Sequence, residues 1–166
     1  MKLKTILAAI AVLTMGLAAH ADTVSFTLTH PTLFVDGAAG GSVTYEVTAT
    51  AAAGNGAAVN LNGDSFNVGA PLTLDDSDFF SDAPLSLNPG ETETFDLFSI
   101  TVPAGTTPGD YTGFFTVLGG ADGGSSDVLG TVNFATVVTP EPGSLILLGT
   151  GLLGAFTTLK RKRFSN

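Results

Sequence analysis

The chain has 166 residues, no cysteine, and 15 acidic residues against six Lys and Arg, which gives a formal charge of −9. All six cations lie at positions 2, 4 and 160–163, so residues 22–139 contain 14 acidic residues and neither Lys nor Arg. This composition excludes disulfides, thiolate metal sites and cysteine nucleophiles, and it argues against nucleic-acid binding, which needs cations at the phosphates.

The N-terminal 21 residues have the organisation of a secretory signal peptide. A charged n-region, an apolar h-region and an A-x-A cleavage site follow one another. They are Lys2 and Lys4, residues 6–18, and the tripeptide Ala19, His20 and Ala21. We expect a signal helix that signal peptidase removes, leaving a mature chain that begins at Asp22. An uncleaved N-terminal anchor is the alternative, and the short h-region disfavours it.

Residues 22–139 are expected to form one domain of short β-strands. Apolar residues alternate with polar ones at the two-residue period of a half-buried strand, and Gly, Pro, Asn and Asp clusters separate the runs. The alternating sets are Val24, Phe26 and Leu28; Val43, Tyr45 and Val47; Phe95 and Leu97, then Ile100 and Val102 on the opposite face or past a bulge; Tyr111, Phe115 and Val117; and Val128, Val132 and Phe134.

Seven or more such strands favour an all-β fold, an antiparallel β-sandwich, with a small barrel as the alternative. A domain of this size can bury one core without disulfides. The expected core includes Phe95, Leu97, Tyr111, Phe115, Val132 and Phe134. Residues 49–58 and 119–127 are predicted to be Gly-rich loops, and residues 59–64 and 65–74 to be two short strands around Gly63-Asp64.

Four aspartates gather in the segment DDSDFFSD: Asp75, Asp76, Asp78 and Asp82. Calcium takes six to eight oxygen ligands in irregular geometry, so the cluster is a candidate calcium site. The spacing lacks the Gly and Glu of the EF-hand loop, however, and Phe79 and Phe80 suggest an aromatic plug beneath hydrated carboxylates. We favour a solvated loop, with weak calcium binding as the alternative and no other cofactor.

Three further features are weak indicators of chemistry. The segment from Gly120 to Asp127 resembles a single copy of a Gly-Asp calcium repeat, which needs many copies. Gly149, Gly151 and Gly154 match G-x-G-x-x-G, but the residues that follow are too few for a βαβ unit, and a helix-packing face suits them better. His30 is the only imidazole after residue 21. Carboxylate pairs could serve glycoside hydrolysis, but no catalytic residue is indicated, so we expect a non-enzymatic protein.

Residues 140–166 have three parts. Pro140, Glu141 and Pro142 precede 17 uncharged residues, 143–159, which as a helix span about 25 Å, the short end of what crosses a bilayer. A basic cluster follows: Lys160, Arg161, Lys162 and Arg163. Such a cluster resists translocation, so the pattern predicts a transmembrane helix with a cytoplasmic tail. A buried helix of a soluble domain is the alternative.

These three parts, in this order, resemble the PEP-CTERM sorting signal. The resemblance implies processing by exosortase, a membrane-embedded cysteine protease/transpeptidase of Gram-negative bacteria, and an association with extracellular polysaccharide and biofilm.

Separately, residues 87–117 resemble bacterial immunoglobulin-like and fibronectin-like modules in their two Pro-Gly turns and in Tyr111, placed as a corner tyrosine. That second resemblance implies an immunoglobulin-like sandwich and carries no activity.

Two functions remain from the sequence. The first is a non-enzymatic protein, exported across the inner membrane, transiently anchored, and then located at the cell surface or in the extracellular matrix. The second is a binding module for carbohydrate or calcium. Aromatic residues on one exposed sheet face would support the second function, whereas inward-facing Phe residues would favour the first.

Overall fold

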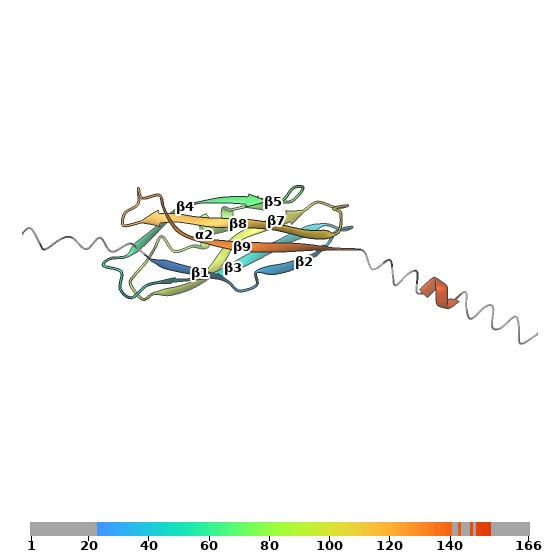
Figure 1. Cartoon of the computed structure of the whole chain (residues 1–166), viewed down its shortest axis with the longest axis horizontal. Coiled ribbons are helices and arrows are strands. Elements are labelled where there is room, and N and C mark those ends of the chain that lie inside the picture. The colour runs from blue at the N-terminus through green and yellow to red at the C-terminus, as the bar shows by residue number, and fades with distance from the viewer. Residues whose placement is uncertain (1–22, 141–142, 144–146, 148, 154–166) are drawn as a thin grey trace, which may run out of the picture.

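The computed structural model describes residues 23–140, 143, 147 and 149–153. Residues 23–140 form an elongated structure that the chain enters at one end and leaves at the other (Figure 1). Its elements are β1 (Val24–Leu28), β2 (Thr32–Asp36), β3 (Gly41–Ala51), β4 (Val59–Val68), β5 (Thr73–Asp75), α2 (Ser77–Asp82), β6 (Ser86–Leu87), β7 (Thr92–Val102), β8 (Gly109–Gly120) and β9 (Asp127–Thr139).

Both terminal segments fall largely outside this description. The predicted signal peptide and its cleavage residues, Ala19 and Ala21, lie outside the described residues, as do Glu141, Pro142 and the basic cluster. Most of the predicted membrane span, 143–159, lies outside them as well. Within the described part of the chain, no helix has the length and hydrophobicity of a membrane span.

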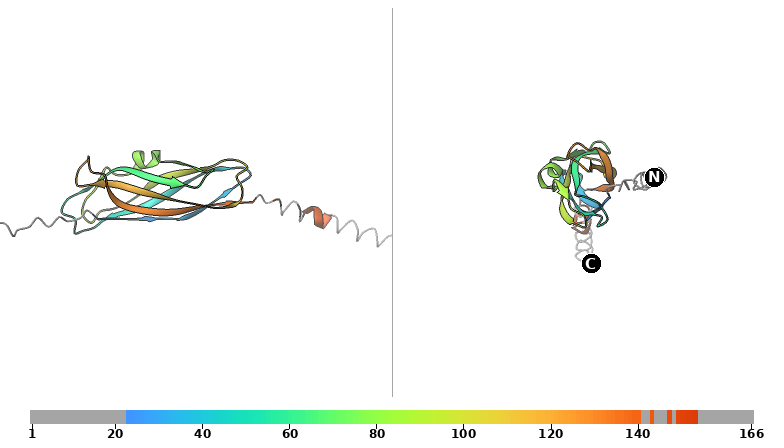
Figure 2. Two further views of the ribbon diagram at one scale, coloured as in Figure 1. Left: turned by 45° about the horizontal axis from the view of Figure 1, so that its top comes forward. Right: turned by 90° about the vertical axis from the view of Figure 1, so that its left-hand side faces the viewer.

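The strands form two sheets that pack as a β-sandwich. One has the order β1-β3-β7-β5 and the other β2-β9-β8-β4-β6. This order corresponds to the two sheets of an immunoglobulin constant-type domain, with β2 added beside β9 and β6 beside β4. The end-on view in Figure 2 shows the sheets curling around one core.

The described strands are antiparallel, as predicted, except at one pair. β2 runs parallel to β9, in the register Thr32 with Ala135 to Asp36 with Thr139. The reason is that the chain changes sheets between β1 and β2 without reversing direction. Pro31 lies in this link, and its carbonyl accepts a hydrogen bond from the Ala135 amide at 2.9 Å.

Five aromatic rings dominate the core, which contains the expected residues. The Phe98 ring lies 4.9 Å from that of Tyr45, 5.0 Å from that of Phe115 and 4.7 Å from that of Phe134. Phe79 packs 6.0 Å from Phe115. Of the six predicted core residues, Tyr111 is partly buried and the other five are buried. Tyr45, buried as well, donates its hydroxyl to the Ala135 carbonyl at 2.8 Å.

Two bulges decide which residues face the core. On β7, Tyr45 pairs with Phe98 and Glu46 with Asp96, so Leu97 is the extra residue. The bulge alternative for Ile100 and Val102 is therefore confirmed, since Phe95, Leu97, Phe98, Ile100 and Val102 are all buried. On β9 the extra residue is Leu129, and Val128, expected on the apolar face, is 67% exposed.

The middle of the chain differs from the prediction. Val59–Val68 is one strand, because Gly63-Asp64 lies within it and does not form a hairpin turn. A register shift between Leu61 and Gly63 leaves Asn62 as the extra residue, and its amide donates to the carbonyls of Asp122 at 2.7 Å and Ser125 at 2.9 Å. The predicted loops are also shorter, since β3 continues to Ala51 and β8 to Gly120.

Candidate functional site

The C-terminal segment leaves the sandwich without a linker. β9 ends at Thr139, and Pro140 is the next residue. The Thr139 carbonyl accepts a hydrogen bond from the Gly37 amide at 3.0 Å, and its hydroxyl donates to the Val35 carbonyl at 3.2 Å. Pro140 has no N–H and cannot continue the ladder. The first residue of the Pro-Glu-Pro triplet is therefore fixed against the folded domain.

Two turns surround this exit, and we call them the base: residues 37–40 between β2 and β3, and residues 103–108 between β7 and β8. The Gly105 amide donates to the Gly37 carbonyl at 2.8 Å, which ties the turns together. A Cβ atom at Gly37 would lie 2.6 Å from the Thr106 carbonyl oxygen, so the turns are closely packed. An open depression of about 370 Å³ lies here, lined by Gly37, Ala38, Gly105, Thr106, Thr107, Pro108, Thr139 and Pro140.

Tyr111 holds the second of these turns in place. Its hydroxyl donates to the Thr107 carbonyl at 2.9 Å, four residues upstream. This is the reach of a corner tyrosine at the start of the corresponding immunoglobulin strand, which confirms the sequence prediction for this residue. The side chain of Thr106 closes the turn, because its hydroxyl donates to the Pro103 carbonyl at 2.6 Å.

The outer face of the β2-β9-β8-β4 sheet carries a second depression. Asn67, Phe114 and Asn133 lie side by side on β4, β8 and β9. Thr112, Ala135 and Thr32 form the next row, across β8, β9 and β2. The depression has a volume of about 470 Å³, and its lining is Pro31, Thr32, Asn67, Thr112, Gly113, Phe114, Asn133, Phe134 and Ala135.

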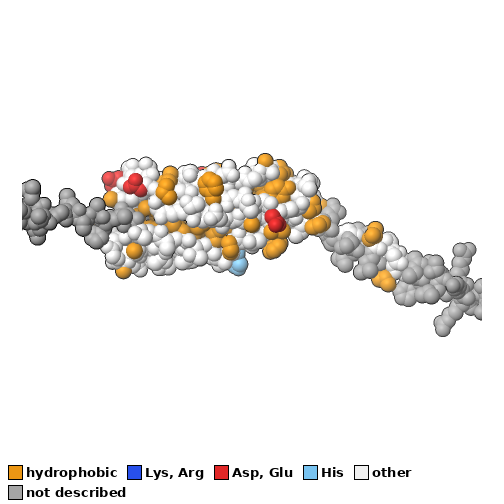
Figure 3. Space-filling model, in the orientation of Figure 1, with side chains coloured by type: hydrophobic (Ala, Val, Ile, Leu, Met, Phe, Trp, Pro, Cys, Tyr) orange, Lys and Arg blue, Asp and Glu red, His pale blue; other side chains and the backbone are white. Residues whose placement is uncertain are grey.

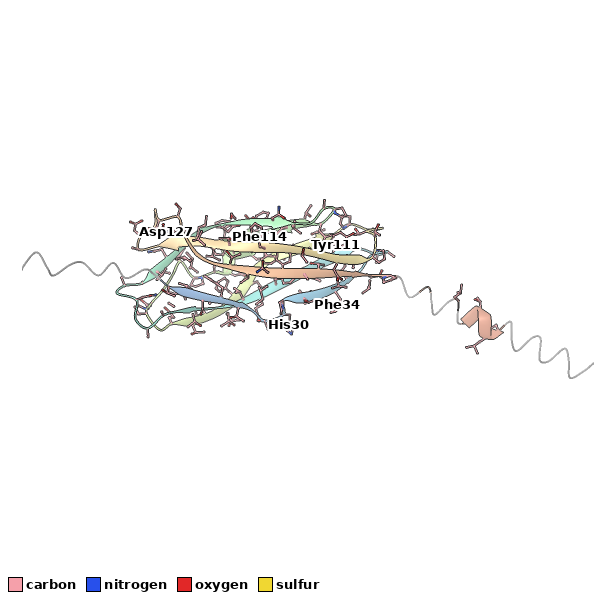
Figure 4. All side chains as sticks on the ribbon, viewed as in Figure 1. His30, Phe34, Tyr111, Phe114 and Asp127 are labelled. Carbon is pink, nitrogen blue, oxygen red and sulfur yellow. The ribbon has the colours of Figure 1, made fainter. Side chains whose placement is uncertain are left out.

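Two phenylalanines are exposed on this same face. Phe114 is 40% exposed in the middle of β8, and Phe34 is 66% exposed on β2, toward the end from which the chain leaves (Figure 4). Figure 3 shows scattered hydrophobic side chains and few acidic ones on one side of the molecule. The sequence pattern missed β2 and therefore gave no indication of Phe34.

The four clustered aspartates do not converge on one point. Asp75 accepts a hydrogen bond from the Ser77 amide at 3.0 Å, and hydrogen bonding with Ser77 lowers the pKa of Asp75. Asp78 accepts from the Ser99 hydroxyl at 2.6 Å, while Asp82 is exposed at the end of α2. Among the residues that the structure describes, no three acidic or histidine side chains gather as a metal site would require.

Where the sequence suggested a loop, Asp78 and Asp82 lie in the short helix α2, while Asp75 is the last residue of β5 and Asp76 precedes the helix. α2 places Phe79 in the core at 2% exposure and leaves Phe80 63% exposed. The Phe79 ring therefore fills the sandwich core as the predicted aromatic plug, whereas the Phe80 ring lies on the surface.

Asp64 is the titrating residue that the sequence pattern missed. It pairs with the buried Val117, so its side chain lies on the inner face of β4. Burial, and secondly the charge of Asp76, raise the pKa of Asp64 to about 6. Its position after Gly63 suggested a turn, which concealed an inward-facing carboxylate.

The remaining sequence candidates lie apart from these features. His30 is exposed in the link between β1 and β2 (Figure 4). Asp122 accepts hydrogen bonds from the Gly124 amide at 2.9 Å and the Ser125 hydroxyl at 3.0 Å; these bonds lower its pKa and close the β8–β9 loop. Gly149 and Gly151 are helical, whereas Gly154 lies outside the described residues.

Comparison with known families identifies the segment that follows the exit. The family model of the PEP-CTERM protein-sorting motif matches residues 138–162. The chain carries a PEP-CTERM sorting motif. The motif implies that the protein is exported and that exosortase is its processing enzyme. The match begins at Val138, inside β9, so the PEP-CTERM motif overlaps the folded sandwich.

Several solved structures match the chain at low sequence identity. An α2-macroglobulin from Escherichia coli is 18% identical with a TM-score of 0.45, and the match covers 71% of this chain and 17% of that one. An MSP-domain-like protein of Caenorhabditis elegans is 17% identical, with a TM-score of 0.38 and coverages of 66% and 94%. A C. elegans MSP family member is 10% identical, with a TM-score of 0.40 and coverages of 69% and 97%. No curated protein matches the chain.

Proposed function

We propose that this is a non-enzymatic protein of the cell surface or extracellular matrix that exosortase cuts from a transient membrane anchor. The observation that carries the proposal is a PEP-CTERM motif joined directly to an acidic β-sandwich. In this proposal signal peptidase removes residues 1–21, residues 143–159 halt in the bilayer, and the basic cluster stays cytoplasmic. Pro140 and Pro142 disfavour helix and leave an extended segment for the protease.

The lining of the two depressions supports a role without catalysis. An enzyme site needs titrating groups in a pocket, often with shifted pKa values. Among the described residues, neither the depression at the base nor the one on the outer sheet face is lined by an acidic residue or a histidine. Attachment to extracellular polysaccharide belongs to this proposal as the role after export.

The sorting step can be tested in the native host. Protein purified from the surface of wild-type cells is expected to lack the tail containing Arg163 by mass spectrometry. In a strain without exosortase, or after Glu141→Ala, uncut protein should accumulate in the inner membrane. An intact tail on surface-purified wild-type protein would show that the segment is a permanent anchor, and the proposal would fail.

The outer sheet face favours a second candidate, a binding module for a neutral polysaccharide. Asn67 and Asn133 flank Phe114, so amide donors and acceptors stand on both sides of an exposed ring. Sugars present hydroxyl groups around an apolar C–H face, which matches an aromatic platform with adjacent amides. None of the described residues that line the depression is charged, and residues 22–139 contain no Lys or Arg, so an acidic polysaccharide is disfavoured.

Native electrophoresis in gels containing β-glucan, mannan, xylan or alginate tests this candidate. The full chain in detergent should be retarded by at least one of the three neutral polymers and not by alginate. Phe114→Ala should abolish the retardation, whereas Phe80→Ala, which removes an exposed ring from α2, should not. Unretarded migration in all three neutral gels would eliminate the candidate. Concentration-dependent self-association that Phe114→Ala abolishes would instead assign the face to a second copy of the chain.

A further inference from the structure

The distance between the folded domain and the sorting triplet is set by the chain itself. Thr139 is fixed by hydrogen bonds to Gly37 and Val35, and no residue separates it from Pro140. A fully extended chain advances at most about 3.6 Å per residue, so the end of Pro142 lies within about 11 Å of Thr139. A protease that encloses this triplet must therefore approach the sandwich to within a few side-chain lengths.

The surface that such a protease meets is the base. Its two turns are joined by the hydrogen bond from the Gly105 amide to the Gly37 carbonyl. The Tyr111 hydroxyl holds the second turn through its hydrogen bond to the Thr107 carbonyl. We propose that the base is a contact surface for exosortase, and that the enzyme recognises the end of the folded domain together with the Pro-Glu-Pro triplet. This inference rests on the proposed function, since it names the surface used by the same processing reaction.

The chemistry of the base suits close approach by a second protein. The depression around Pro140 is lined by Gly, Ala, Thr and Pro, and none of these side chains is charged. Gly105 has φ +78°, and a Cβ atom there would meet nothing within 4 Å, so the surface is low and open beside the exit. Small neutral residues impose little desolvation cost when another surface covers them.

A bulky side chain on the base tests the inference. Thr107 is suitable, because its side chain is exposed and its contact with Tyr111 uses only the backbone carbonyl. In the native host, Thr107→Trp should slow removal of the tail about tenfold or more, as followed by pulse-chase and mass spectrometry. Ser126→Trp is the matched control: it lies in the β8–β9 loop at the opposite end of the sandwich and should be processed at the wild-type rate.

A linker separates a contact effect from a folding effect. Inserting Gly-Ser-Gly-Ser between Thr139 and Pro140 adds about 14 Å of reach, so the enzyme no longer needs to meet the base. The insertion should restore processing of Thr107→Trp, which a misfolded variant would not show. Processing of Thr107→Trp at the wild-type rate, or no rescue by the linker, would overturn the inference. If Glu141→Ala is also cut normally, the proposed function itself has failed; if Glu141→Ala is blocked, only the role of the base is wrong.

Discussion

The two long edges of the sandwich are closed by different means. On one edge the chain passes from β1 in the first sheet to β2 in the second, and main-chain hydrogen bonds continue through the link. The Thr29 amide donates to the Glu46 carbonyl at 3.0 Å, and the Ala135 amide donates to the Pro31 carbonyl at 2.9 Å. On the other edge β5 has three residues and β6 has two, and α2 inserts Phe79 into the core. The first edge depends on backbone pairing and the second on one side chain.

This difference matters because the pairing on the second edge is incomplete. β6 pairs only with Val59 and Asn60, and among the described residues no other strand lies beside β4 on that side. Unpaired strand edges promote association with other chains unless charge, bulges or short lengths disrupt them. β4 contains two of these features: the bulge at Asn62 and the inward-facing Asp64.

The largest expected effect concerns the plug on the second edge. Phe79→Ala should reduce the free energy of unfolding by about 3 to 5 kcal/mol, because a buried ring is lost and a cavity remains. Phe80→Ala, one residue away and exposed, should change it by less than about 0.5 kcal/mol. Urea denaturation of the two variants measures the difference, and equal effects would show that α2 does not act as a plug.

The first edge should respond less to a side-chain deletion. Val35 on β2 is buried, so Val35→Ala should cost about 1 to 2 kcal/mol through lost burial and a small cavity. Phe34→Ala on the outer face is the control and should have little effect. If Val35→Ala destabilises as much as Phe79→Ala, the distinction between a backbone-closed and a side-chain-closed edge is wrong.

Asp64 is expected to give the smallest effect, and its sign depends on pH. Its pKa of about 6 in the folded protein exceeds the ordinary value of 3.8, so the native state binds a proton more tightly than the unfolded state does. Stability contributed by this group is therefore lost as pH rises from about 4 to 6. Asp64→Asn should raise the free energy of unfolding by about 1 kcal/mol at pH 7, after allowance for solvent screening, and give no such gain near pH 3.5.

Chemical denaturation at several pH values tests this prediction. Asp96→Asn, at an exposed position on β7, is the matched control for the loss of one negative charge and should change the free energy of unfolding by less than about 0.5 kcal/mol. A stability gain for Asp64→Asn that is the same at pH 3.5 and pH 7 would contradict a titrating, partly buried carboxylate. Increased aggregation of the same variant at pH 7 would show that the partly buried charge of Asp64 protects the free edge of β4.

Strong local patterns predicted the sandwich well. The phase change between Leu97 and Ile100 indicated either a change of face or a bulge, and the structure has the bulge. The Pro-Gly-Asp-Tyr sequence placed Tyr111 at its corner. Two elements escaped prediction: β2 has three consecutive apolar residues, Leu33, Phe34 and Val35, instead of an alternating pattern, and the six-residue α2 is too short to establish a helical period and lies in an acidic run. Gly63-Asp64 resembles a turn locally, and only the pairing with β8 makes it part of a strand.

The base could not be predicted for a different reason. Its turns, around Gly37 and Thr106, are distant in the sequence from each other and from Pro140, and nothing in either turn indicates the other. Their contact follows from the parallel pairing of β2 with β9, which the sequence pattern did not suggest. The sorting motif, by contrast, is a continuous segment and was recognised by its resemblance to the PEP-CTERM signal, which the family match confirms.

The parallel pair also determines how the domain bears tension. β1 begins at one end of the sandwich and β9 leaves at the other, so a pull between the two ends acts along the strands (Figure 1). Force that arrives through Pro140 meets β9 where Asp36 and Gly109 lie on its two flanks. The hydrogen bonds of both ladders are then loaded together in shear, not broken one after another. If the protein is anchored in the membrane as proposed, tension from the anchor would therefore enter β9 where strands pair with it on both sides.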